Sequence, residues 1–157
     1  MGRPGPLRRV LPAPRAGAPL EVVAAGAVPR YPPWVRGDAL KVLIADDDRL
    51  VRVMLTDLLT EMGHTVTSAE NGAEAVILAG RDTPDLLIFD FLMPKLSGLD
   101  ALLEIRRHRP VPAVLLTAIN EGSLRGLDGV DQVQVLLEKP FSRRTIERAI
   151  DKATRGR

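Results

Sequence analysis

The stretch VLIADDD, residues 42–48, is the part of this 157-residue chain that decides its fold. The four apolar residues from Val42 to Ala45 are followed directly by three aspartates. A short apolar run bounded by polar residues is typical of a strand in a parallel sheet, where both faces are covered. The segment DLLIFD, residues 85–90, repeats the pattern and ends in Asp90. We therefore predict two buried strands that carry carboxylates at their carboxyl ends.

Helical and strand patterns alternate along the chain on either side of these strands. Strands are expected at 42–45, 64–69, 85–89, 113–116 and 133–137, and helices at 50–62, 73–79, 99–105, 120–127 and 143–150. Asp48 and Ser142 are expected to cap the first and last helices, because acids and serine favour that position. Five alternations of this kind predict an α/β domain with a parallel sheet and helices on both faces.

Four of the expected strands end in polar or charged residues. These are Asp46 and Asp47 after the first strand, Asp90 after the third, Thr117 after the fourth and Lys139 after the fifth. Parallel sheets of this class bind ligands beyond the carboxyl ends of their strands. The sequence therefore predicts a site at this edge of the sheet.

Three carboxylates in one pocket would repel each other, and burial would raise their pKa values. A hard divalent cation with oxygen ligands resolves this conflict, and magnesium suits a site that also takes phosphate oxygens. We expect Asp46 and Asp47 to hold magnesium directly or through water, with Asp90 and the backbone carbonyl of Leu92 completing the set.

The same edge offers the groups that phosphoryl transfer requires. A carboxylate such as that of Asp90 is a competent nucleophile and would give an acyl phosphate. Catalysis of this transfer consists mainly of positioning and charge stabilisation. Lys139 offers a compact cation and Thr117 a hydroxyl donor, and the small Ala118 leaves room for the transferred group.

Five segments together resemble the receiver domains of two-component response regulators, the CheY-like family. They are Ile44-Ala45-Asp46-Asp47-Asp48, Asn71-Gly72-Ala73-Glu74-Ala75, Asp90-Phe91-Leu92-Met93-Pro94 with Gly98, Leu116-Thr117-Ala118 and Glu138-Lys139-Pro140-Phe141. The resemblance runs from about Lys41 to Arg155. Each motif is weak alone, but their order and spacing are specific.

This resemblance implies a flavodoxin-like, doubly wound (βα)5 fold with strand order 2-1-3-4-5. It implies that a histidine kinase or a histidine phosphotransfer protein phosphorylates Asp90 in the presence of magnesium. Thr117 would then move toward the phosphoryl group and change the face formed by the fourth helix, fifth strand and fifth helix, which would contact a downstream protein. The Lys139-Pro140 bond would be cis.

Three positions depart from the common pattern or bear on the lifetime of the phosphate. Leu136 stands where many receivers carry an aromatic switch residue. Leu92 lies two residues beyond Asp90, and Ile119 lies two residues beyond Thr117. Both side chains would flank the path of a hydrolytic water, and neither can orient it by hydrogen bonding. We therefore expect slow autodephosphorylation and no enzymatic turnover.

Two other functions remain open from the sequence. The Asp46-x-Asp48 spacing is shared with haloacid-dehalogenase-type aspartyl phosphatases, but Leu50 stands where those enzymes normally carry threonine or valine. They also need a cap and a longer chain. A degenerate receiver that acts only as an interaction module is the second alternative, which Leu136 favours mildly and the intact acid pair opposes.

Composition divides the chain into a tail at 1–38 and a receiver domain at 39–155. The tail holds eight of the 13 prolines and six arginines, which predicts a disordered or semi-extended segment with a charge of +4. The remainder carries a charge of −2, so DNA binding is not expected.

No apolar run approaches the roughly 20 residues that span a bilayer. We expect a cytoplasmic, stand-alone protein that is a monomer or a weak dimer through the face formed by the fourth helix, fifth strand and fifth helix.

Overall fold

The computed structural model describes residues 39–155, so the expected tail at 1–38 lies outside the described residues. Five strands form one parallel sheet: β1 (Lys41–Ala45), β2 (Thr65–Ala69), β3 (Leu86–Asp90), β4 (Ala113–Thr117) and β5 (Val135–Glu138). Their order in the sheet is β2-β1-β3-β4-β5. The predicted fold class and strand order are therefore confirmed.

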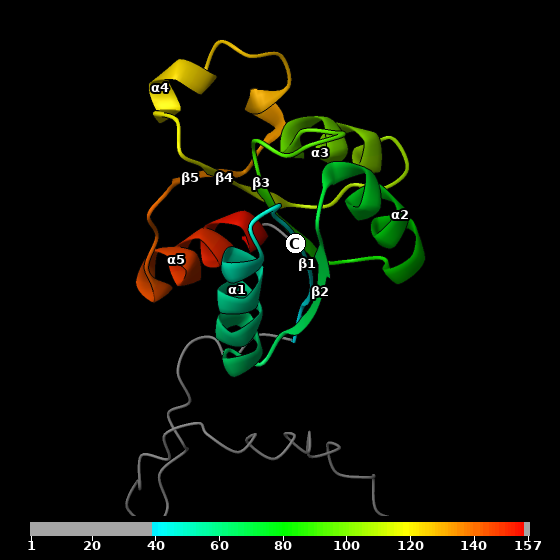
Figure 1. Ribbon diagram of the computed structural model, residues 1–157, viewed down its shortest axis with the longest axis vertical. Helices are drawn as coiled ribbons and strands as arrows, with labels where there is room; N and C mark the ends of the chain where they lie inside the picture. Colours follow the sequence, from blue (N-terminus) through cyan, green and yellow to red (C-terminus); the bar gives the residue numbers. More distant parts are fainter. Residues whose placement is uncertain (1–38, 156–157) are drawn as a thin grey trace, which may run out of the picture. The chain divides into compact units, whose positions relative to one another are not determined.

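Helices cover both faces of this sheet (Figure 1). They are α1 (Arg49–Glu61), α2 (Gly72–Asp82), α3 (Gly98–Arg106), the short α4 (Glu121–Leu124) and α5 (Arg143–Thr154), with a 3-10 turn, η2, at Val130–Gln132. Asp48 caps α1 by accepting a hydrogen bond from the Leu50 amide, and Ser142 caps α5. Both predicted caps are confirmed. None of the helices in the described part of the chain has the length and apolar character needed to cross a membrane.

Two apolar cores hold the layers together, one on each face of the sheet. Helices α1 and α5 pack on one face and α2 and α3 on the other, as the ribbon shows (Figure 1). Every residue of β3 and β4 is buried. This agrees with their unbroken apolar runs, which are typical of central strands in a parallel sheet. The polar residues at the ends of these strands are therefore carried on a rigid, fully packed frame.

The segment between β4 and β5 differs from its prediction. The helix expected at 120–127 is present only as α4, because glycines at 122 and 126 disfavour helical backbone. The strand expected from Val133 begins at Val135 instead, since the Val133 amide donates to the Val130 carbonyl and closes the 3-10 turn. Gly129 opens that turn with a φ of 89°.

Not all of the apolar residues expected on the buried side of α1 are buried. Leu50 is 78% exposed and Met54 is 49% exposed, whereas Leu55 and Leu59 are fully buried. The buried stripe is therefore narrower than the run of apolar residues at 50–62, and the amino-terminal half of α1 presents apolar side chains to solvent.

Candidate functional site

The carboxyl ends of four strands meet at one edge of the sheet. Pairing of Ala45 with Phe89 brings the residues after β1 beside the end of β3, and Asp90 pairs with Leu116 of β4. Thr117, the next residue, pairs with Glu138 at the end of β5. The strand register thus gathers the residues that the sequence predicted to lie together.

Three carboxylates form the centre of this edge. Asp46, Asp47 and Asp90 each offer one carboxylate oxygen, and these oxygens all lie within 4.8 Å of one another. Asp46 is 1% exposed and Asp90 8% exposed, while Asp47 is open to solvent. The predicted carboxylate cluster therefore exists, with two members inside the protein and one at its mouth.

Lys139 lies between the two buried carboxylates. Its Nζ is 3.1 Å from Asp46 Oδ2 and 3.3 Å from Asp90 Oδ1. Burial alone would lower the pKa of Lys139, but the hydrogen bonds and negative charges of these two carboxylates outweigh it and raise the pKa. Lys139 is therefore held as a cation that both aspartates share.

The charge of the site is not fully balanced by this lysine. Burial raises the pKa of Asp90 to about 6, the charge of Asp46 adds to the rise, Lys139 opposes it, and Asp47 contributes a smaller rise. Oxygen ligands that repel each other in this way suit a hard divalent cation, and magnesium accepts one or two carboxylates together with waters and phosphate oxygens. The residues present therefore fit a magnesium ion.

Asp46 has a partner for each of its polar atoms. Its amide donates to the Ala69 carbonyl at 3.3 Å, and its carbonyl accepts from Arg52 Nη1 at 2.8 Å. Its Oδ1 accepts from the Asp48 amide at 2.9 Å, and its Oδ2 accepts from Lys139. Asp46 is therefore fixed by four separate parts of the fold. Arg52 was missed by the sequence reading; its place one turn into the helix that follows the aspartates was the only available signal.

The Thr117 hydroxyl is engaged within its own loop. It accepts from the Ile119 amide at 2.9 Å and donates to the Ile119 carbonyl at 3.2 Å. Within residues 39–155 no hydrogen bond joins this hydroxyl to Asp90. Thr117 is 1% exposed and lies at the predicted strand end, but its hydroxyl faces Ile119 in this conformation.

The loop after β3 carries Leu92 and folds back onto the strand end. Leu92 lies two residues beyond Asp90 and is 58% exposed. The Gly98 amide donates to the Phe91 carbonyl at 3.0 Å, and a Cβ at Gly98 would lie 2.0 Å from the Asp90 carbonyl oxygen. Only glycine fits this close approach. On the other side of the site, the Lys139-Pro140 bond is cis, as predicted.

Comparison with known proteins places this geometry in a family. Residues 42–151 match the response regulator receiver domain family. The chain belongs to this family. A probable transcriptional regulator, ycf27, from Porphyra purpurea is 38% identical over 113 residues, which are 70% of this chain and 45% of that protein. The transcriptional regulatory protein PdtaR from Mycobacterium tuberculosis is 41% identical over 103 residues, 65% of this chain and 50% of PdtaR.

Solved receiver structures have the same architecture. Chemotaxis protein CheY4 from Vibrio cholerae superimposes with a TM-score of 0.69 at 25% identity, over 74% of this chain and 99% of CheY4. The receiver domain of sensor histidine kinase PA1611 from Pseudomonas aeruginosa was solved with magnesium in its active-site cleft. It superimposes with a TM-score of 0.66 at 28% identity, over 74% of this chain and 98% of that domain.

These matches establish the receiver domain of a two-component response regulator, which is a signalling module. The chain spans about half the length of the curated relatives described above.

Proposed function

We propose that this receiver domain accepts a phosphoryl group on Asp90 from a histidine kinase or a histidine phosphotransfer protein. The observation that carries the proposal is the meeting of three carboxylates and Lys139 at one strand edge, within a chain of the receiver family. Two of the three carboxylates are buried, where their mutual repulsion is unfavourable unless a cation offsets it.

The proposed transfer follows from the groups on Asp90 and around it. One carboxylate oxygen of Asp90 attacks the phosphorus of a phosphohistidine, the P–N bond breaks, and the imidazole leaves with the electron pair and takes a proton. The product is an acyl phosphate on Asp90. Lys139, 3.3 Å from Asp90 Oδ1, is placed to neutralise a phosphoryl oxygen.

Magnesium would be held by Asp46, Asp47 and Asp90, with the backbone carbonyl of Leu92 as a further ligand. When bound, the ion neutralises the carboxylates and the charge on the transferred phosphoryl oxygens. The raised pKa of Asp90 supports this assignment, because burial and the charges of Asp46 and Asp47 disfavour the ionised carboxylate, and a cation would favour it.

Thr117 is proposed to report the phosphoryl group to the face formed by α4, β5 and α5. Its hydroxyl would exchange its bonds with Ile119 for a bond to a phosphoryl oxygen, which alters the β4–α4 loop. Leu136, half-buried in β5, replaces the aromatic side chain that many receivers use here. A downstream protein would read the change by binding this face.

Acetyl phosphate with magnesium tests the proposal, with modification followed on phosphate-affinity gels and by intact mass. We expect one phosphoryl group per chain, dependent on magnesium, and none in Asp90→Asn. Asp57→Asn, an exposed aspartate on α1, is the matched control and should be modified like the wild type. Continuous release of phosphate would instead indicate a phosphatase, and no modification would indicate a degenerate receiver.

The phosphorylated state is proposed to be long-lived. Leu92 and Ile119 offer no side-chain hydrogen bond to a hydrolytic water. We expect the phosphate to persist for many minutes after the donor is removed by desalting into magnesium buffer. Leu92→Gln, which adds a side chain able to orient water, should shorten this time. Loss within seconds from the wild type would contradict the proposal.

A further inference from the structure

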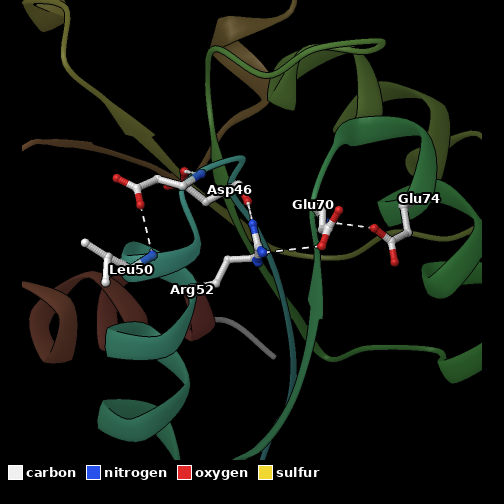
Figure 2. Close-up of polar contacts among 6 residues, drawn as sticks. Asp46, Leu50, Arg52, Glu70 and Glu74 are labelled. Carbon is white, nitrogen blue, oxygen red and sulfur yellow. Dashed lines mark hydrogen bonds and ion pairs between the residues drawn. The ribbon is translucent and has the colours of Figure 1, made fainter.

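Arg52 connects α1 to the loop that carries the acidic residues. Its side chain is 13% exposed, and Nη1 donates to the Asp46 carbonyl oxygen at 2.8 Å. Figure 2 shows the guanidinium between Asp46 and Glu70. An arginine beside a carboxylate cluster normally pairs with a carboxylate, but here the close bond goes to a backbone oxygen.

We propose that Arg52 is a positioning residue that sets the magnesium affinity of the site by fixing the direction in which the chain leaves β1. The proposal rests on the proposed function, in which Asp46, Asp47 and Asp90 hold magnesium. It concerns a residue outside that ligand set.

The planarity of the peptide bond explains how a bond to the Asp46 carbonyl acts on Asp47. The carbonyl oxygen of Asp46 and the Cα of Asp47 lie in one peptide plane. Because the Asp46 amide is also held by the Ala69 carbonyl, anchoring that oxygen restricts rotation of the plane and with it the position of the Cα of Asp47. Asp47 is the exposed member of the cluster, whereas Asp46 is held by its own side-chain bonds to Asp48 and Lys139. Arg52 thus fixes the ligand that has the least support of its own.

The choice of a carbonyl acceptor also keeps Arg52 from competing with the metal. A guanidinium bound to a carboxylate oxygen would occupy a ligand position, as Lys139 does on Asp46 Oδ2. Arg52 leaves the Asp47 carboxylate untouched. Residues that orient metal ligands in this indirect way typically contribute 10- to 100-fold to metal affinity, and about tenfold is expected here.

The contact of Arg52 with Glu70 is the weaker of the two. Nη2 lies 3.5 Å from Glu70 Oε1, and the Glu70 side chain is 72% exposed. Exposed ion pairs of this kind contribute little. The Glu70 amide donates to Glu74 Oε2 at 2.8 Å, a backbone bond that Glu70→Gln retains (Figure 2). Glu70→Gln therefore removes the ion pair alone and is the matched control.

Isothermal titration of the full chain with MgCl2 tests the proposal. Arg52→Met, which keeps the apolar stem, should weaken magnesium binding about tenfold, whereas Arg52→Lys and Glu70→Gln should stay within about threefold of the wild type. In EDTA, amide hydrogen exchange of the 46–48 segment should be faster in Arg52→Met than in Glu70→Gln. Unfolding in urea confirms that each variant is folded. If Arg52→Met does not fold, Arg52→Gln, whose amide is too short to reach the carbonyl, takes its place.

The outcomes separate the two proposals. A wild type that binds no magnesium would overturn the proposed function and this inference with it. A wild type that binds magnesium, with Arg52→Met binding equally well, would overturn only the role of Arg52. Equal losses in Arg52→Met and Glu70→Gln would show that the ion pair, not the carbonyl bond, carries the effect, and would also overturn it.

Discussion

Asp90→Asn should stabilise the magnesium-free protein, although it removes the proposed phosphoacceptor. The pKa of Asp90 is about 6 in the folded protein, against an ordinary value of 3.8. At neutral pH the folded state therefore carries an ionised carboxylate that its surroundings disfavour. Asparagine has nearly the same shape without the charge, so the substitution removes this penalty at the price of one contact with Lys139.

The pKa difference sets the magnitude of this stabilisation. A difference of one in pKa corresponds to about 1.4 kcal/mol, so the change from 3.8 to about 6 amounts to about 3 kcal/mol at pH 7.5. The opposing effect of Lys139 is already contained in this pKa. We expect Asp90→Asn to raise the free energy of unfolding by about 2–3 kcal/mol in EDTA.

The sign of the pH dependence follows from the same pKa. The folded state binds the Asp90 proton more tightly than the unfolded chain, so this group destabilises the wild type as pH rises through the interval from 3.8 to about 6. Asparagine does not titrate. The advantage of Asp90→Asn should therefore shrink to about 1.5 kcal/mol at pH 5 and vanish when the unfolded chain is also protonated.

Urea unfolding followed by far-UV circular dichroism measures these free energies in EDTA at pH 7.5 and pH 5. Asp57→Asn makes the same change in charge on the exposed side of α1 and should stay within about 0.5 kcal/mol of the wild type. Magnesium at 100 times its dissociation constant should stabilise the wild type by about 2.7 kcal/mol and Asp90→Asn by less. An Asp90→Asn protein that is less stable than the wild type in EDTA, or an advantage that is equal at both pH values, would show that the charge of Asp90 does not destabilise the fold.

Three further substitutions test other parts of the fold by the same unfolding assay. Thr83→Gly should stabilise by about 1 kcal/mol, because the β-branched Thr83 ends α2 with a φ of 47°, which glycine adopts without strain; lower stability would contradict this. Gly98→Ala should destabilise by about 3 kcal/mol, because the new Cβ would lie 2.0 Å from the Asp90 carbonyl oxygen; an unchanged urea midpoint would contradict this. His64→Asn should lose less stability than the wild type between pH 7.5 and 5.5. Burial lowers the pKa of His64, whose Nδ1 accepts from the Leu40 amide, so protonation of the unfolded chain destabilises the wild type as pH falls; parallel pH profiles would contradict this.

The sequence predicts the strands and the polar residues that follow them. Runs such as Leu86 to Phe89 are typical of strands buried on both faces of a covered parallel sheet, and a carboxylate directly after such a strand lies at the edge of that sheet. Because parallel strands share a direction, one edge collects all of these ends. The pattern of apolar runs followed by charged residues therefore predicts that Asp46, Asp90 and Lys139 lie close together.

The weakly patterned segments were not readable to the same degree. A short segment such as 120–127 gains little from local propensity, so its helix length depends on tertiary packing. In α1, the apolar positions cover more than one side of the helix, and the pattern alone does not say that Leu50 and Met54 face solvent. The core on this face takes Leu55 and Leu59 from α1, and sequence periodicity does not say which apolar positions fill it.

Contacts to the backbone were hidden for a different reason. Arg52 bonds to the Asp46 carbonyl, and a carbonyl acceptor has no residue type that marks it in a sequence. The rotamer of Thr117 is hidden likewise, since its hydroxyl can bond to its own loop at Ile119 or to a group in the site. Residue identity predicted the chemistry available at the edge, and only the three-dimensional arrangement shows which bonds are made.

The three aspartates, though similar in sequence, differ in what the fold leaves them free to do. Asp46 is partnered at every polar atom and anchors the edge, whereas Asp47 is exposed and Asp90 is buried with a raised pKa. Lys139 contacts both Asp46 and Asp90, so its contact with Asp46 would remain if Asp90 carried a phosphoryl group. Burial and the charges of Asp46 and Asp47, which raise the pKa of Asp90, also favour a cation at this edge, and that cation would in turn offset the charge of the proposed phosphoryl group.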